Sequence, residues 1–306
     1  MKYLFIIFSL LLTSSCTNKP NPMWIFNAED QVKGISIVNN SENVIVVSGN
    51  RMDLLNSKSG KSIKHVSISA NEVNSIACNW PFCIIGGGNH LSGHLELINF
   101  ETGLKIRTNN SEQFAQINSI AIGSDDVIVT AHSDETLISW GIKDLSVRKR
   151  LNLFDGLEVY SLRYFNGYYI AGNDGGNLII WDGVSEKALK QVNPESEPIF
   201  TIEQIDGEIL VGGWEYLDFV DSNMLVKRHV SFKNVAVVSC SASIDSTMIW
   251  CGLSDGSLVQ IDVNGQRKFE FKAHTDSVKF VNILDNIIVT GSKDGTVKGW
   301  DISKLK

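Results

Sequence analysis

The amino-acid sequence predicts an all-β fold, a seven-bladed β-propeller of four-stranded antiparallel blades. Three observations predict it: a strand–turn–strand pattern recurs seven times, its copies are evenly spaced, and its turns are rich in Gly, Asn and Asp. Length alone would allow two domains in 306 residues. Because the repeats fill residues 23–306, the sequence predicts a single domain.

The last repeat, residues 273–302, shows the pattern most clearly. Two apolar runs, 278–284 and 287–290, are joined by an Asp-Asn pair, and a turn at 293–295 leads into a further run at 296–300. Apolar runs of this length with turn residues at both corners are typical of an antiparallel meander. This repeat therefore predicts three consecutive strands.

The other repeats are aligned on the apolar residue that ends the third strand. These anchor positions are 39 to 43 residues apart and are Leu55, Ile98, Trp140, Trp181, Val220, Ile261 and Trp300. A fourth strand follows the anchor in the earlier repeats, whereas an additional strand at 23–27 precedes the first repeat. We expect that N-terminal strand to complete the last blade, because a propeller ring is closed by joining the two chain ends in one sheet.

Four polar or aromatic side chains of the last repeat carry a family resemblance: His274, Thr290, Asp294 and Trp300. With this set the chain resembles the WD40-repeat family over residues 23–306, and the resemblance implies a buried network joining the four. A buried indole N–H and a buried carboxylate each need a hydrogen-bond partner. The third repeat keeps part of the set (Thr130, Asp134 and Trp140), and the fourth keeps Trp181. Repeats one, two and five have lost it.

The turns at 59–61 and 101–103 are similar to those of a second group, the quinoprotein-like propellers, which includes a lipoprotein of the outer-membrane β-barrel assembly machine. This resemblance implies an envelope-assembly component. The His, Thr, Asp and Trp set favours the WD40-repeat family.

The N-terminal residues predict a targeting signal. Lys2 is followed by an apolar run at 3–12. This run is too short to cross a membrane but suits a signal peptide at residues 1–15. Thr13, Ser14 and Ser15 before Cys16 resemble a bacterial lipobox, which implies lipidation of Cys16, a tether at 16–22 and an outer-membrane location. The alternative is an ordinary secretory signal cleaved nearby.

Four cysteines fall on neighbouring predicted strands: Cys78 and Cys83 flank one hairpin corner, and Cys240 and Cys251 lie on successive strands of the sixth repeat. In an oxidising compartment each pair is placed to form a disulfide. The alternative is that all four are small buried thiols.

The sequence predicts no enzyme, cofactor or metal site. It contains no nucleophile elbow, phosphate-binding Gly-rich loop or zinc-type cysteine spacing. His90 and His94 have a metal-ligand spacing only on a helix, and they lie in a turn region. The formal charge of -7 argues against a nucleic-acid partner. The alternative is an extracytoplasmic propeller enzyme, similar to a lactonase or lyase, with its site at the mouth of the channel.

The function predicted is non-catalytic: a monomeric scaffold that binds another protein and touches the membrane through the lipid alone. The loops entering the first strands and the turns between the second and third strands share one face of such a fold. Candidate contact residues there are Arg51, His132, Trp214, Tyr216 and Lys293. Trp, Tyr and Arg dominate interface energies. The alternative is that Trp214 and Tyr216 pack between blades.

Overall fold

A computed structural model describes residues 20–305, except 39–41, 70–71, 90–91, 112–113, 124–126, 153–156, 183–186, 193–196 and 244, and gives the backbone alone at 110–111 and 187–192. The predicted signal peptide, Cys16 and the first residues of the tether lie outside the described residues. Within the described part, no helix is long and apolar enough to span a membrane.

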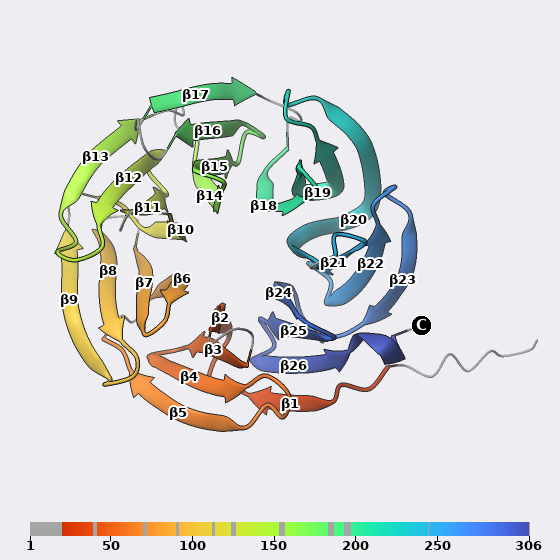
Figure 1. Cartoon of the computed structure of the whole chain (residues 1–306), viewed down its shortest axis with the longest axis horizontal. Coiled ribbons are helices and arrows are strands. Elements are labelled where there is room, and N and C mark those ends of the chain that lie inside the picture. Colours follow the sequence, from red (N-terminus) through yellow and green to blue (C-terminus); the bar gives the residue numbers. More distant parts are fainter. Residues whose placement is uncertain are drawn as a thin grey trace, which may run out of the picture.

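Six antiparallel sheets are arranged in a ring around a central axis, and each contributes at least one strand to the inner side of the ring (Figure 1). The first sheet is β2 (Val32–Val38), β3 (Asn43–Ser48), β4 (Arg51–Asn56) and β5 (Ser62–Ser67). The second is β6 (Val73–Asn79), β7 (Phe82–Asn89), β8 (Ser92–Asn99) and β9 (Leu104–Ser111). The third is β10 (Ile117–Ile122), β11 (Val127–His132), β12 (Thr136–Gly141) and β13 (Val147–Asn152). The fourth is β14 (Val159–Phe165), β15 (Tyr168–Asn173), β16 (Leu178–Asp182) and β17 (Lys187–Val192).

The prediction of seven separate four-stranded blades is wrong. The described strands form six sheets, because a six-stranded sheet covers the region that the repeats assign to the fifth and sixth blades. Its order is β18 (Ile199–Ile205), β19 (Glu208–Val220), β20 (Val226–Ala242), β21 (Met248–Leu253), β22 (Ser257–Asp262) and β23 (Arg267–Lys272).

The two long strands β19 and β20 join the six-stranded sheet by changing partners along their length. β19 pairs with β18 through Gly213 and with β20 from Trp214 onward, while β20 pairs with β21 from Val237. Figure 1 shows β20 running from the outer rim to the inner side of the ring. Residues 226–242 contain neither Gly nor Pro. The chain therefore lacks the residues that most strongly interrupt a strand at this point.

The two ends of the described chain meet in one sheet. β1 (Trp24–Asn27) pairs with β26 (Thr296–Asp301), and the sheet continues through β25 (Ile287–Ser292) to β24 (Val278–Leu284), with a 3-10 turn at Ile302–Lys304. The Trp24 indole donates a hydrogen bond to the Ser57 carbonyl of the first sheet, 3.0 Å away. A Cβ at Gly299 would lie 2.2 Å from the Trp24 ring. This glycine lets the tryptophan close the ring.

Glycines in second strands allow neighbouring sheets to approach closely. A Cβ at Gly172 would lie 2.5 Å from Ile199, and one at Gly291 would lie 2.6 Å from Ile35. In each case the neighbour belongs to the innermost strand of the next sheet. The apolar core is therefore divided into clusters, most of which lie between successive sheets, such as the one that joins Ile84 and Leu95 to Ile120 and Trp140.

Each innermost strand, and the inner end of β20, has the same irregularity. Its pairing register skips one residue near the start of the strand, as in a β-bulge, and these residues are Lys33, Asn74, Asn118, Tyr160, Phe200, Val238 and Lys279. A bulge redirects the side chain that it carries. The repeated fold therefore places one variable side chain from every innermost segment at the same level of the channel.

Candidate functional site

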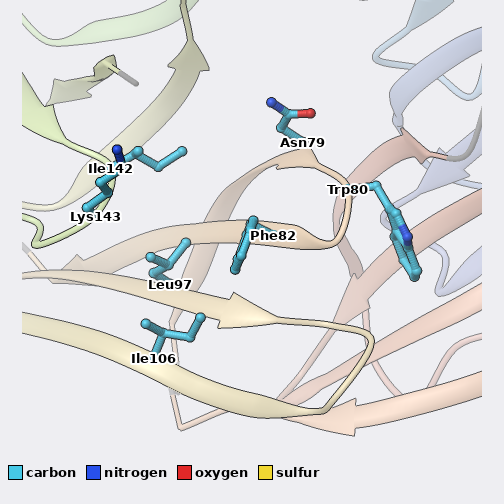
Figure 2. A pocket seen from close by; sticks show the side chains of 7 residues that line it. All are labelled: Asn79, Trp80, Phe82, Leu97, Ile106, Ile142 and Lys143. Carbon is cyan, nitrogen blue, oxygen red and sulfur yellow. The ribbon is translucent and has the colours of Figure 1, made fainter. Parts of the chain in front are cut away.

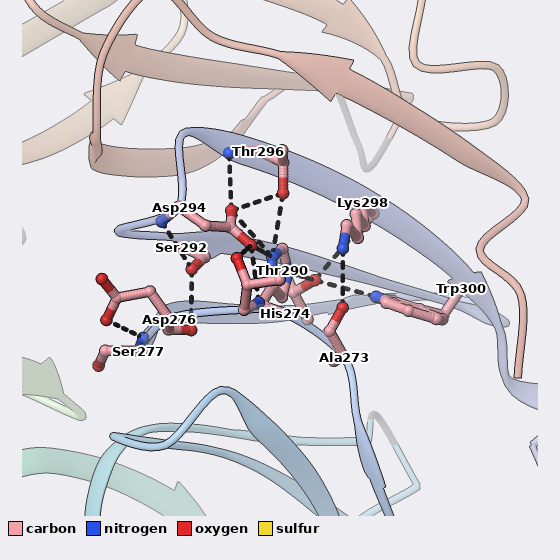
Figure 3. Close-up of polar contacts among 11 residues, drawn as sticks. Ala273, His274, Asp276, Ser277, Thr290, Ser292, Asp294, Thr296, Lys298 and Trp300 are labelled. Carbon is pink, nitrogen blue, oxygen red and sulfur yellow. Dashed lines mark hydrogen bonds and ion pairs between the residues drawn. The ribbon is translucent and has the colours of Figure 1, made fainter. Parts of the chain in front are cut away.

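The four residues of the last repeat form a continuous hydrogen-bonded chain (Figure 3). Trp300 Nε1 donates to Thr290 Oγ1 at 2.9 Å, and His274 Nε2 lies 2.7 Å from the same hydroxyl. His274 Nδ1 lies 3.0 Å from Asp294 Oδ2. Burial lowers the pKa of His274 to about 4, against the opposing charge of Asp294. A neutral ring that donates to Asp294 and accepts from Thr290 satisfies all these contacts.

The third sheet builds the same chain from a histidine that we assigned to the partner-binding surface. His132 is fully buried, and its Nε2 lies 2.6 Å from Thr130 Oγ1, which accepts a hydrogen bond from Trp140 Nε1 at 2.7 Å. His132 Nδ1 lies 2.9 Å from the Ala115 carbonyl oxygen. Burial lowers its pKa to about 4. The structure therefore places His132 inside the core, and Asp134 instead accepts from the Thr136 hydroxyl.

Trp181 of the fourth sheet is buried without this chain. Its indole nitrogen has no hydrogen-bond partner within the described part of the protein. The pairing register explains this absence. Trp181 lies opposite Tyr169, and Trp300 of the last sheet lies opposite Ile288. Two residues further along the second strand, the fourth sheet therefore has Ala171 where the last sheet has Thr290. The fourth sheet thus keeps the tryptophan and lacks the hydroxyl.

Buried carboxylates occupy the repeats that lost the network. Each lies two residues before an aliphatic anchor, and they are Asp53, Glu96 and Asp218. Asp218 Oδ1 accepts from His229 Nδ1 at 2.7 Å, and Asp53 Oδ1 accepts from Arg51 at 2.6 Å. These three buried carboxylates were not identified from the sequence. The signal was an acidic residue two positions before an aliphatic anchor.

Glu96 shows how such a carboxylate is held. Burial raises its pKa, but hydrogen bonds from His94 and Ser69 and the charge of Lys105 outweigh burial, so the pKa lies below its usual value. The His94 Nε2 to Glu96 Oε2 distance is 3.2 Å, and that from Lys105 Nζ to Oε1 is 3.3 Å. The residue is therefore a buried anion with several donors.

The structure places both predicted cysteine pairs in disulfides across adjacent strands. Cys78 and Cys83 join β6 to β7, with their Cα atoms 4.1 Å apart, and Cys240 and Cys251 join β20 to β21 at 4.2 Å. Cys251 occupies the position of Thr290, since it lies opposite Val259 as Thr290 lies opposite Lys298. In the sixth repeat, a disulfide therefore stands where the last repeat has its hydroxyl.

The top face is the face formed by loops entering the innermost strands and by turns joining second to third strands. On it Trp214 is 46% exposed, whereas Tyr216 is only 3% exposed. Tyr216 packs against Gly213 and donates a hydrogen bond to the Glu197 carbonyl at 3.3 Å. Tyr216 is therefore a buried support, contrary to its assignment as a contact residue, and Trp214 is the surface aromatic.

The other two predicted contact residues also lie on the top face. Arg51 bridges Glu29, at 2.8 Å, and the buried Asp53, at 2.6 Å. These carboxylates hold its guanidinium in one place and raise its pKa further, the hydrogen bond to Asp53 contributing most. Lys293 is exposed in the turn after β25.

The central channel contains two adjoining cavities. The smaller, of about 150 Å³, lies at the bulge level and is lined by six of the skipped residues: Asn74, Asn118, Tyr160, Phe200, Val238 and Lys279. The larger, of about 340 Å³, lies below it and contains Arg163 and Glu203. Burial raises the pKa of Glu203, although the charge of Arg163 opposes this shift. The mouth of the channel is therefore a polar pocket in the middle of the top face.

The opposite, bottom face carries an apolar groove between the second and third sheets. Figure 2 shows Phe82, Leu97 and Ile106 of the second sheet together, with Ile142 and Lys143 of the third sheet across from them. The groove has a volume of about 490 Å³. Lys143 is the only charged residue among those that line it. Among the described residues, no group of three His, Cys, Asp or Glu side chains could hold a metal ion.

Comparison with solved structures decides the architecture. The chain matches the crystal structure of the computationally designed Ika8 protein with a TM-score of 0.67, over 90% of this chain and 98% of that one. This chain is a β-propeller. At 16% sequence identity the likeness concerns the fold alone.

Sequence comparison adds less. No family model matches the propeller. Among curated proteins, Mitochondrial division protein 1 of Pyricularia oryzae is 43% identical over 51 residues, which are 16% of this chain and 8% of that protein. The matched segment is therefore a small part of both chains.

Proposed function

We propose that this chain is a WD40-like propeller that binds another protein through its top face, as a monomer and without catalysing a reaction. The exposed Trp214 carries this proposal. It lies between Gly213, which admits the Tyr216 ring beneath it, and Glu215, which has a positive φ of 68°. A large aromatic side chain on a backbone fixed from below costs little entropy when it is buried by a partner.

The surroundings of Trp214 support docking at the same face. Glu215 Oε1 accepts a hydrogen bond from the Asn234 N–H at 2.5 Å, which ties the turn to β20. Arg51 is held by two carboxylates on the other side of the ring. Rigid loops around a stiff ring present these groups without reorganisation. The WD40-like networks of the third and last sheets support membership in that group of propellers.

Photo-crosslinking tests the docking face. A photoreactive phenylalanine placed at Trp214 should crosslink one protein in the producing cells, whereas the same group at Phe82, 38% exposed on the bottom face, should not. Trp214→Ala should then weaken binding of that purified partner at least tenfold without changing the melting temperature, and Phe82→Ala should leave the affinity unchanged. Crosslinks at Phe82 alone, or an unchanged affinity of Trp214→Ala, would contradict the proposal.

We propose further that a lipid on Cys16 holds the propeller outside the cytoplasm, at a bacterial outer membrane. The support is the sequence Thr13-Ser14-Ser15-Cys16 after a short apolar run. An alkyne-labelled fatty acid fed to the cells should be incorporated into the wild-type protein and lost in Cys16→Ser, which should leave the membrane fraction. Cys78→Ser is the matched control and should stay labelled. Labelling of Cys16→Ser would refute the anchor.

A further inference from the structure

The skipped residues at the channel mouth divide the ring into two halves of different chemistry. One half, consecutive around the ring, carries cations and amides: Lys279, Asn74 and Asn118 line the cavity, and the charge of Lys33 acts on Lys279 from the neighbouring position. The skipped residues of the other half are aromatic or apolar: Tyr160, Phe200 and Val238. Arg163, on the same strand as Tyr160, also lines the cavity there. The same backbone irregularity recurs in each repeat, and it explains why these side chains lie at one level. It does not explain why cations and amides gather in one half and aromatic and apolar residues in the other.

Within the described part of the protein, the lysines of the cationic half form no ion pair. No ion pair or hydrogen bond joins Lys33 or Lys279 to another described side chain, and both are only partly exposed. Burial and the charges of Lys293 and Lys33 lower the pKa of Lys279, and Asp276 opposes them only in part. Like charges gathered in a half-buried place disfavour the folded state. An anion bound among them would relieve that repulsion.

The amides beside the lysines are fixed in position. Asn74 Nδ2 donates to the Ile117 carbonyl at 3.2 Å, and Asn118 Nδ2 donates to the Val159 carbonyl at 3.1 Å. Each amide thus bridges to the next sheet. Opposite them, the Tyr160 and Phe200 rings lie with their centroids 5.9 Å apart. The mouth is therefore preorganised, with a polar wall facing an aromatic wall.

The surrounding loops limit the size of the anion. Acidic side chains lie close to the residues of the mouth: Glu158 and Asp174 near Tyr160, and Asp276 near Lys279. A polyanion would be repelled by this rim, whereas a single carboxylate reaching the centre would meet the lysines. The cavity of about 150 Å³ also admits a side chain and excludes a folded segment.

We infer that the channel mouth binds one carboxylate attached to an apolar or aromatic group, with the carboxylate between Lys279 and Lys33 and the apolar part against Phe200 and Tyr160. The carboxylate has two sources, an acidic side chain of a docked protein or a small free carboxylate. The first source rests on the proposed function and the second does not.

Four probes in two matched pairs test the inference on the intact propeller. Ac-Phe-Glu-NH2 with its neutral twin Ac-Phe-Gln-NH2 represents a peptide, and 3-phenylpropanoate with 3-phenylpropanamide represents a free carboxylate. We expect saturable binding of an acidic probe in calorimetry, at least tenfold tighter than its neutral twin. The tighter of the two acidic probes identifies the source. Equal binding of acid and amide, or no binding of either acid, overturns the inference.

Charge-removing variants locate the site. Lys279→Met and Lys33→Met should each weaken binding of the acidic probe about tenfold and leave the neutral twin unaffected, which matches the loss of a charge-assisted hydrogen bond. Lys58→Met, in the exposed turn after β4, is the matched control and should change nothing. Melting curves verify that each variant is folded. Unchanged acid binding in both mouth variants overturns the inference.

The same variants separate this inference from the proposed function. If the crosslinked partner still binds Lys279→Met with full affinity while Trp214→Ala loses it, docking on the top face stands and insertion of an acidic side chain from that partner fails. If no partner crosslinks at Trp214 but 3-phenylpropanoate binds and requires Lys279, the proposed function fails and the carboxylate site stands.

Discussion

His132 Nε2 lies 2.6 Å from the Thr130 hydroxyl, and the pair repeats in the third sheet the contact that His274 makes with Thr290 in the last. The two histidines reach that position by different routes. His274 precedes the innermost strand of its sheet, whereas His132 ends the second strand. In both sheets the indole N–H donates to the hydroxyl, and the hydroxyl O–H donates to the imidazole Nε2. Such a chain requires a neutral imidazole, because a protonated ring has no acceptor.

Removal of the shared hydroxyl should destabilise the third sheet. Thr130→Val keeps the shape of the side chain but leaves the Trp140 N–H and the His132 nitrogen buried without a partner. We expect a loss of about 2 to 4 kcal/mol in the free energy of unfolding, measured in urea. Thr108→Val on the exposed strand β9 is the control and should stay within about 0.5 kcal/mol of wild type. Equal stability of the two variants would refute this role.

The stability of the propeller should fall as the pH is lowered from 6.5 toward 4. Burial lowers the pKa values of His132 and His274 from the ordinary 6.5 to about 4. Between those values the unfolded chain binds more protons than the folded one, so acid favours unfolding. Each histidine should contribute a slope of about 1.4 kcal/mol per pH unit.

Urea unfolding at pH 7, 6 and 5 measures this dependence. His132→Gln should be less stable than wild type at pH 7, and its stability should depend less steeply on pH. His65→Gln, on the outer strand β5, should keep the wild-type slope. A wild-type slope in His132→Gln would show that this histidine does not titrate as the geometry requires.

A hydroxyl introduced at Ala171 should stabilise the fourth sheet. Ala171→Ser places an acceptor where Thr290 lies in the last sheet, within reach of the unpaired Trp181 indole. We expect a gain of about 0.5 to 1.5 kcal/mol in unfolding free energy. Ala131→Ser is equally buried, but its side chain points to the other face of its strand, so it should give no gain. Equal changes in the two variants would contradict this explanation.

The buried carboxylate Glu96 should matter more than an exposed one. Glu96→Gln removes a charge that accepts from His94 and Ser69 and pairs with Lys105. Because its donors would then face a neutral amide, we expect a loss of about 2 kcal/mol. Glu101→Gln in the following turn is exposed and should be nearly neutral. Thermal unfolding at pH 7 compares the two variants. Equal melting temperatures would show that the Glu96 charge does not stabilise the fold.

The two disulfides should contribute unequally. They close segments with sequence separations of 5 and 11 residues. Loop-closure entropy predicts about 2 kcal/mol for the Cys78–Cys83 bond and about 3 kcal/mol for Cys240–Cys251. Replacing each pair by alanine and measuring unfolding with and without reductant tests this. Each variant should be less stable than the oxidised wild type and should approach the stability of the reduced wild type. If the wild type is equally stable with and without reductant, the predicted contribution of the disulfides is wrong.

The repeat period and the strand order could be predicted from the sequence because they depend on local patterns. Apolar runs with Gly, Asn and Asp turns define most strands, and the additional strand at 23–27 pairs with β26 as expected. The division into sheets could not be predicted in the same way. Around Trp214 and Asn234 the two strands change partners without ending, and positive φ values at Glu215 and Asn234 provide the bends. Nothing in the pattern of apolar residues distinguishes such a bend from a loop.

The residues of the candidate site also fall into those that the sequence could predict and those that it could not. The polar set of the last repeat could be identified from residue types, because a buried indole and carboxylate need partners. The role of His132 could not, since its imidazole comes from a different strand position and meets Thr130 only after the sheet has folded. Tyr216 and Trp214 are two residues apart on one strand, and tertiary packing against Gly213 decides which of them is buried.

The sequence by itself determined a ring of repeated antiparallel strands, its closure by the chain ends and the location of its variable loops, since these depend on spacing and turn chemistry. Only the tertiary structure decided how many sheets form, which polar groups are buried and which side chains meet at the channel mouth. The skipped residues Lys33 and Lys279 lie 246 positions apart in the sequence. They become neighbours because β1 pairs with β26 and brings the first and last sheets together.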